Sequence, residues 1–232
     1  MRIALLVEYY QRLPERRPSE SPKSWAVRLQ EGLEDFKKLA TARYSEGTFE
    51  RMLTHPNVDA RRAAVLAMGL AGTMTVNKAV AACLHDGDNQ VRQLAGDALW
   101  SMWFRAESES NVRELHRLVR LRNPEKALAG FETLLKNAPG FAEAYNQRAI
   151  LFFRTERFQE SIGDCETALK LNPCHFGAQA GIGQCYMRMR KPRAALRAFR
   201  QALRINPNLE GVEETIRSLE DVLGEEGRTG EK

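Results

Sequence analysis

A fixed period of 34 residues in the second half of the chain constrains its fold more than any other feature. Pro139, Pro173 and Pro207 are separated by this step, and each ends a run of small and aromatic residues at helical spacing. A chain that repeats at such a period consists of units that cannot bury their apolar faces alone, so neighbouring units must stack. The period therefore predicts an all-α fold, an α-solenoid of helix pairs.

Two units, residues 142–175 and 176–209, share a pattern of small, aromatic and proline positions. The recurring residues are Tyr145, Ala149, Phe152, Ser161, Cys165, Ala168 and Pro173 in the first unit, and Gln179, Gly183, Tyr186, Ala195, Phe199, Ala202 and Pro207 in the second. Small residues let two helices cross closely, and the proline ends the second helix. The pattern resembles the tetratricopeptide repeat family. Departures are Arg148 and Ala149 in place of Leu-Gly and Gln179 in place of an aromatic residue, and residues 108–141 match only in part.

A second period, of 31 residues, occurs upstream. In the second copy an Asp-x-x-Val-Arg-x-x-Ala-x-x-Ala pattern runs from Asp88 through Val91 and Arg92 to Ala98, and the first copy departs from it at Asn57 and Ala60. Asp88 and Asn57 are suited to cap the helix that each precedes. The pattern resembles short HEAT-like repeats, so residues 45–107 are predicted to form two HEAT-like helix pairs ahead of the tetratricopeptide repeats at 108–209.

The remaining segments are predicted to flank these repeats. Residues 1–23 are an N-terminal segment with a proline-rich, mobile linker, in which residues 1–13 form either a short helix or a strand. Residues 24–44 form an amphipathic capping helix, residues 210–223 form a second capping helix with an acidic face, and residues 224–232 are a disordered tail.

Composition bounds the class of protein. Apolar residues make up 43% of the chain and charged residues 28%, near globular averages, which argues against collagen and low-complexity disorder. The apolar stretch Ile3 to Val7 is too short for a signal peptide or a membrane span, and the four cysteines form no C-x-x-C pair. We therefore expect a cytoplasmic protein without a membrane partner and with reduced thiols.

No catalytic constellation is found in the sequence. Phosphate-binding, dinucleotide-binding, zinc-protease and nucleophile-elbow motifs are missing, and Cys174-His175 lacks partners at metal-ligand spacing. The chain is therefore predicted to be non-catalytic, with no cofactor and no metal. Some proteins with short HEAT-like repeats are phycobilin lyases, so a lyase-like enzyme is an alternative function. It is less favoured because a shared fold does not establish a shared function.

The family resemblance also implies a partner-binding groove, lined by first-helix residues at five places in each unit. We select as binding residues Arg120, Arg154, Arg188, Asn146, Ile150, Phe153, Gln184, Met187 and His116. The three arginines are separated by 34 residues each time and are expected to form a ladder along one edge. A guanidinium donates two parallel hydrogen bonds to a carboxylate or phosphate. The apolar positions would contact a partner's apolar side chains.

These residues predict a scaffold that binds an acidic segment of a protein or peptide. The alternative that the arginines form only a solvated face stays open at this point. The positions of the dicarboxylate clamp, a specialisation within the family, hold Val112, His116, Gln147, Gly177 and Gly181 and do not match it. Residues 108–209 carry 17 basic and 9 acidic residues, so nucleic acid bound to the basic exterior is the alternative function. It is disfavoured because no aromatic residues of the RNA-binding kind are interleaved with the basic run, which consists of Arg188, Arg190, Lys191, Arg193, Arg197, Arg200 and Arg204. The sequence leaves open the partner, the pathway, the oligomeric state, the role of residues 1–23 and whether the two repeat blocks bind separate ligands.

Overall fold

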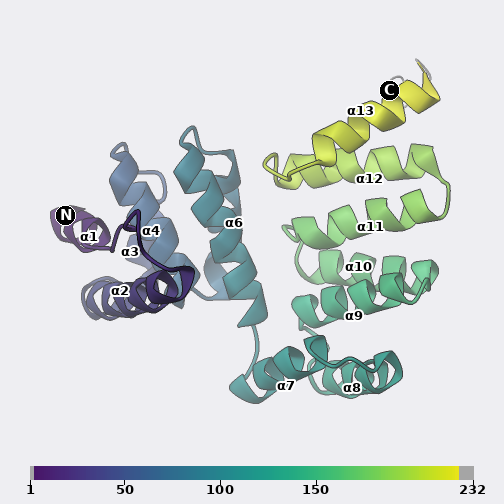
Figure 1. Cartoon of the computed structure of the whole chain (residues 1–232), viewed down its shortest axis with the longest axis horizontal. Coiled ribbons are helices and arrows are strands. Elements are labelled where there is room, and N and C mark those ends of the chain that lie inside the picture. Colours follow the sequence, from purple (N-terminus) through teal and green to yellow (C-terminus); the bar gives the residue numbers. More distant parts are fainter. Residues whose placement is uncertain (1–2, 225–232) are drawn as a thin grey trace. The chain divides into compact units, whose positions relative to one another are not determined.

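The computed structural model describes residues 3–224, and within this range the chain is all-α with no strand, as predicted (Figure 1). The α-helices are α1 (Ile3–Gln11), α2 (Pro22–Arg43), α3 (Glu46–Met52), α4 (Val58–Ala71), α5 (Asn77–Ala82), α6 (Asn89–Phe104), α7 (Glu109–Val119), α8 (Pro124–Asn137), α9 (Ala142–Arg154), α10 (Phe158–Leu171), α11 (Phe176–Arg188), α12 (Pro192–Ile205) and α13 (Val212–Leu223). Two 3-10 helices, η1 (Met74–Val76) and η2 (Cys83–His85), flank α5. The predicted tail lies outside the described residues except for Gly224.

The chain divides into two compact units, residues 1–102 and residues 103–232. The division falls near the end of α6, so Trp103 and Phe104 belong to the second unit. Each unit has its own buried apolar residues.

In the first unit, capping side chains start the two helices α4 and α6. Asn57 Oδ1 accepts a hydrogen bond from the Ala60 amide at 3.1 Å, and Asp88 Oδ1 accepts one from the Val91 amide at 2.9 Å. These bonds satisfy amides that a helix leaves unpaired in its first turn. The sequence turns at Asn57 and Asp88 thus begin helices as expected, while the HEAT-like class of residues 45–107 stays a prediction.

Two arginines of α4 link it to the turn before α6. Arg61 makes bidentate contacts with Asp86, at 2.8 and 2.9 Å, and Arg62 makes bidentate contacts with Asp88, at 2.9 and 2.7 Å. Hydrogen bonds from Arg62 hold the pKa of the Asp88 carboxyl at about 2, below its ordinary 3.8. Ion pairs therefore join α4 to the turn that precedes α6.

The proline-rich linker contacts α2 at several points, and its predicted mobility stays a prediction. Arg28 on α2 binds both carboxylate oxygens of Glu20, at 2.9 and 2.6 Å, and its Nη2 donates to the Glu15 carbonyl at 2.8 Å. A Cβ at Gly32 would lie 2.6 Å from Pro14 Cδ, so the linker packs closely on α2 where that helix has no side chain. The sequence pattern missed this because the anchoring arginine lies in the following helix.

The second unit consists of three helix pairs, α7 with α8, α9 with α10 and α11 with α12, followed by α13 (Figure 1). The first helices α9 and α11 contact each other directly, and α10 lies against both. Gly183 permits the crossing of α11 and α12, since a Cβ there would lie 2.6 Å from Phe199 Cε1. Phe131 and Phe199 are buried at the corresponding crossings of the first and third pairs. This stack positions the candidate site.

Candidate functional site

The three arginines of the predicted ladder lie at equivalent places, the C-terminal ends of the three first helices. Arg120 caps α7, while Arg154 and Arg188 are the last residues of α9 and α11. All three side chains are exposed. Among the described residues, neither Arg120 nor Arg154 forms an ion pair. Their charge is therefore available at the surface.

An apolar residue precedes each arginine in the chain. Val119 and Met187 are 42% and 39% exposed, unusual values for large apolar side chains, and Phe153 is half-buried. The same first-helix end thus presents an apolar group and a guanidinium side by side in each of the three units. Each pair combines a donor of charge-assisted hydrogen bonds with an apolar contact surface.

Arg188 lies against two aromatic rings and a carboxylate. Its Cζ atom is 5.6 Å from the centroid of the Phe153 ring and 5.4 Å from that of Phe158. The two rings meet edge to face at 5.7 Å, and Arg188 Nη2 lies 3.0 Å from Glu156 Oε1. Phe158 and Glu156 were not among the residues selected from the sequence. The sequence offers only one indication of Phe158, which is an apolar residue at the start of α10.

The opposite ends of α9 and α11 hold a buried polar cluster. Glu143 and His175 are both fully buried, with Glu143 Oε2 and His175 Nε2 2.9 Å apart. Trp103 stacks on the His175 ring with a centroid distance of 4.2 Å and an interplanar angle of 23°. Asn146, selected as a groove contact, is only 3% exposed and its Nδ2 donates to Glu143 Oε1 at 3.2 Å. Its side chain is used inside the fold rather than presented to a partner.

The other selected residues occupy one repeat position, in the middle of the first helices. His116 on α7 stacks with Phe104, with ring centroids 5.5 Å apart and planes inclined by 13°. Ile150 on α9 is half-buried, and Gln184 on α11 is exposed. In the structure Arg188 therefore lies over the Phe153 ring, Asn146 donates a hydrogen bond to Glu143, and His116 stacks on Phe104.

Three of the four cysteines, Cys83, Cys165 and Cys185, are buried thiols with low reactivity. Burial raises the pKa of Cys83 to about 11 and that of Cys165 to about 12, and it also raises the pKa of Cys185. Among the described residues no group of three or more His, Cys, Asp or Glu side chains is placed to hold a metal ion. None of the helices described is both long and apolar enough to cross a bilayer.

Family models identify the repeats. One model, described as tetratricopeptide repeat, matches residues 112–175, and a second with the same description matches residues 178–209. Residues 112–175 and 178–209 of the second unit are tetratricopeptide repeats. The family resemblance predicted from the sequence is confirmed for this part of the chain.

Two curated proteins align with the repeats. A TPR repeat-containing protein of Rhizobium etli is 30% identical over 102 residues, which are 44% of this chain and 50% of that protein. Superkiller complex protein 3 of Homo sapiens is 24% identical over 120 residues, which are 51% of this chain and 8% of that protein. The chain therefore spans about half the length of the first relative and a small part of the second.

Solved structures of tetratricopeptide domains are also similar to this chain. The first TPR of Spaghetti (RPAP3), bound to the HSP90 peptide SRMEEVD, has a TM-score of 0.47 and 18% identity, covering 50% of this chain and 95% of that chain. The P58(IPK) TPR domain has a TM-score of 0.42 and 14% identity, covering 90% of this chain and 54% of that chain.

Proposed function

We propose that this chain is a non-catalytic interaction scaffold that binds an acidic segment of a partner protein along the first helices of its tetratricopeptide repeats. The observation that carries the proposal is the threefold recurrence of an apolar residue followed by an exposed arginine, at Val119-Arg120, Phe153-Arg154 and Met187-Arg188. A solvated face has no reason to repeat both members of the pair at one place in each unit.

Arg188 is positioned to bind a carboxylate of the partner. Its pair with Glu156 is exposed, with side-chain exposures of 50% and 72%, and such surface pairs contribute only about 0 to 1 kcal/mol. A partner's carboxylate can replace Glu156 at little cost, while Phe153 and Phe158 keep the guanidinium in place. Arg120 and Arg154 would meet further acidic groups of the same segment.

The chemistry of the pairs sets the form of the ligand. An extended segment with acidic side chains toward the arginines and apolar side chains toward Phe153 and Met187 fits both features. Short segments of this kind bind with about micromolar affinity, or about 8 kcal/mol. The proposal therefore concerns the second unit only, and no ligand is assigned to the first unit.

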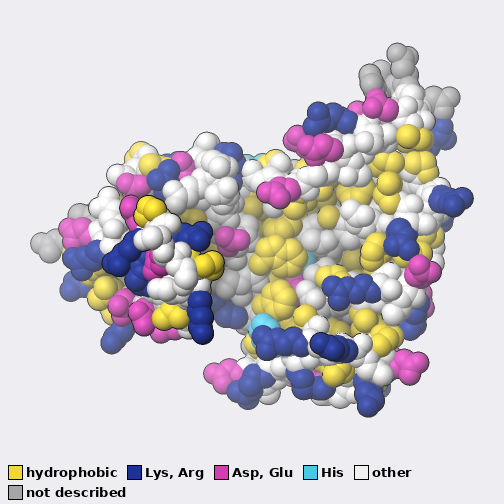
Figure 2. Space-filling view, in the orientation of Figure 1, with side chains coloured by type: hydrophobic (Ala, Val, Ile, Leu, Met, Phe, Trp, Pro, Cys, Tyr) yellow, Lys and Arg dark blue, Asp and Glu magenta, His cyan; other side chains and the backbone are white. Residues whose placement is uncertain are grey.

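Basic charge on the face shown in Figure 2 is dispersed, since Lys and Arg side chains lie among apolar ones over the second unit rather than in one patch. One arginine of the basic run on α12, Arg200, pairs with Glu220 on α13 at 2.7 Å. Both features favour recognition at the first-helix ends over a broad electrostatic surface for nucleic acid.

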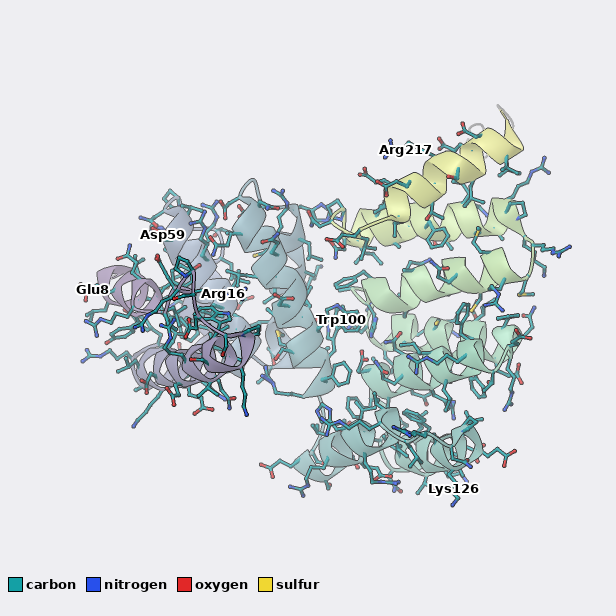
Figure 3. All side chains as sticks on the ribbon, in the orientation of Figure 1. Glu8, Arg16, Asp59, Trp100, Lys126 and Arg217 are labelled. Atoms are coloured by element: carbon teal, nitrogen blue, oxygen red, sulfur yellow. The ribbon has the colours of Figure 1, made fainter. Side chains whose placement is uncertain are left out.

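Affinity purification of the tagged chain from its native cells tests the proposal. The double variant Arg154→Glu and Arg188→Glu should lose the main partner while keeping its helical circular dichroism. The matched control, Lys126→Glu with Lys136→Glu, makes the same change of charge at exposed residues of α8, where Lys126 projects from the stack (Figure 3). Equal recovery of the partner by the arginine variant and the wild type would overturn the proposal.

A further inference from the structure

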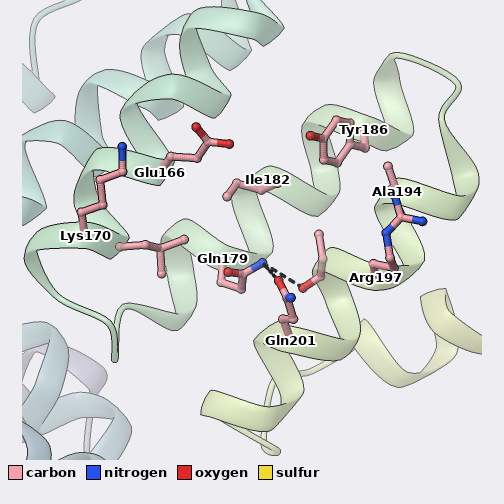
Figure 4. Close-up of a pocket in the computed structure, with 10 residues that line it drawn as sticks. Glu166, Lys170, Gln179, Ile182, Tyr186, Ala194, Arg197 and Gln201 are labelled. Atoms are coloured by element: carbon pink, nitrogen blue, oxygen red, sulfur yellow. Dashed lines mark hydrogen bonds between the residues drawn. The ribbon is translucent and has the colours of Figure 1, made fainter. Parts of the chain in front are cut away.

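A cleft with a volume of about 490 Å³ opens on the second unit between α10 and α12, with α11 as its floor (Figure 4). Glu166 and Lys170 line it from α10, Arg197 and Gln201 line it from α12, and Gln179 and Ile182 line it from α11. None of the residues proposed above to bind at the first-helix ends lines this cleft.

The preceding unit shows why the cleft exists. At the positions 34 residues earlier, Tyr145 replaces Gln179, Arg148 replaces Ile182 and Asp164 replaces Ala198. The Tyr145 ring packs against the cores on both sides of it, and Arg148 lies 5.6 Å from the centroid of that ring. Arg148 also makes a bidentate pair with Asp164 at 2.6 and 2.7 Å. The last unit lacks the ring, the guanidinium and the carboxylate, and the cleft occupies the space between its helices.

The side-chain amide of Gln179 lies on the floor of this cleft. Gln179 is 7% exposed, and its Nε2 donates to the Ala198 carbonyl at 3.3 Å and to Gln201 Oε1 at 3.1 Å (Figure 4). Among the described residues its Oε1 accepts no hydrogen bond. This oxygen keeps some contact with solvent, so it is accessible to a ligand that donates a hydrogen bond in the cleft.

The rim of the cleft is basic. Lys170 and Arg197 stand on opposite helices, Glu166 is the single acidic residue lining the cleft, and all three are exposed. The floor is apolar, with Ile182 only 8% exposed. Charge complementarity therefore favours an apolar group flanked by acidic groups.

We propose that this cleft binds the side chain of a tyrosine within an acidic segment of a partner protein. The ring would fill the space that Tyr145 fills in the preceding unit, its hydroxyl would donate to Gln179 Oε1, and neighbouring carboxylates would meet Lys170 and Arg197. This site is separate from the first-helix ends, so it can hold whether or not the proposed groove does.

Nuclear magnetic resonance titration of the full chain tests this site with three capped peptides, Glu-Tyr-Glu, Glu-Ala-Glu and Lys-Tyr-Lys. The side-chain amide signals of Gln179 and Gln201 report on binding. We expect Glu-Tyr-Glu to shift both signals, with the two other peptides at least about tenfold weaker. Shifts that are absent, or equal for Glu-Ala-Glu, would overturn the proposal.

Variants separate this cleft from other sites. Gln179→Tyr supplies the ring of the preceding unit and should abolish binding of Glu-Tyr-Glu, followed at Gln201. Ala198→Leu fills the same space from α12 and is the second test variant, used if Gln179→Tyr does not fold. Lys126→Glu, at an exposed residue of α8 outside both proposed sites, should leave the affinity unchanged. Retained affinity in a folded, filled variant contradicts the site, and so does an equal loss of affinity in Lys126→Glu.

Discussion

Glu143 Oε2 lies 2.9 Å from His175 Nε2 in a bond that is fully shielded from solvent and joins the first helices of successive repeats. The Ala178 amide donates to His175 Nδ1 at 3.1 Å, so this nitrogen is the acceptor and Nε2 carries the proton. Asn146 and Gln147 donate to the other carboxylate oxygen at 3.2 and 2.6 Å. The Glu143 carboxylate thus accepts hydrogen bonds from three donors, two from its own helix and one from His175, which caps the start of α11.

We expect Glu143→Ala to lower the free energy of unfolding by about 3 kcal/mol, because it leaves buried donors without an acceptor. A double-mutant cycle with His175→Ala should give a coupling energy of about 1 to 3 kcal/mol in chemical denaturation. The exposed Glu132→Ala on α8 is the control and should change stability by less than about 0.5 kcal/mol. Additive effects of the two substitutions would show that the bond does not link the repeats.

Asp88 combines a helix cap with an ion pair, and two substitutions separate these roles. Asp88→Ala loses both and should cost about 1 to 2 kcal/mol at neutral pH, whereas Asp88→Asn keeps a capping oxygen and should cost less. The pKa of Asp88 falls from its ordinary 3.8 to about 2 on folding, chiefly through its hydrogen bond to Arg62.

A lowered pKa stabilises the fold fully above the ordinary value and loses that effect as the pH falls through the folded value. The stability difference between wild type and Asp88→Asn should therefore be constant near neutral pH and shrink below about pH 4. Denaturation curves recorded across this range measure it. A difference that grows on acidification would contradict the ion pair.

Glu156 and Arg190 occupy the same repeat position, in the turn after each first helix, and have positive φ angles of 59° and 56°. This conformation strains residues other than glycine, so Arg190→Gly should raise the free energy of unfolding by about 1 kcal/mol. Glu156→Gly relieves the same strain but also removes the partner of Arg188. Thermal denaturation measures the stability of both variants against that of the wild type. A loss of stability in Arg190→Gly would contradict the expectation that the positive φ angle strains this residue.

The repeat architecture was predictable because it depends on residues that recur at a fixed period. Small residues at helix crossings and prolines after second helices are local requirements of each pair, as Gly183 against Phe199 illustrates. The turns at Asn57 and Asp88 were predictable for the same reason, because a cap acts on amides two or three residues ahead. The groove residues were placed through the family resemblance, and their binding role stays a proposal.

The features that escaped prediction depend on pairs of residues distant in sequence. His175 is 32 residues from Glu143, and nothing in either segment indicates that the two side chains meet. The anchoring of Glu20 by Arg28 across the linker is similar, because a proline-rich segment alone reads as mobile. Gln179 was noted as a departure from the family pattern, but the cleft follows only when Ile182 and Ala198 are seen beside it.

The central claim is that the partner lies along the first helices, and photo-crosslinking from a single position tests it most directly. A photoreactive amino acid replacing Gln184, exposed on α11, is compared in native cells with the same group replacing Glu132, exposed on α8. We predict a discrete crosslinked protein from position 184 that disappears when Arg154 and Arg188 are changed to Glu, and none from position 132. Crosslinks from position 132 alone, or from position 184 unaffected by the arginine changes, would contradict the account.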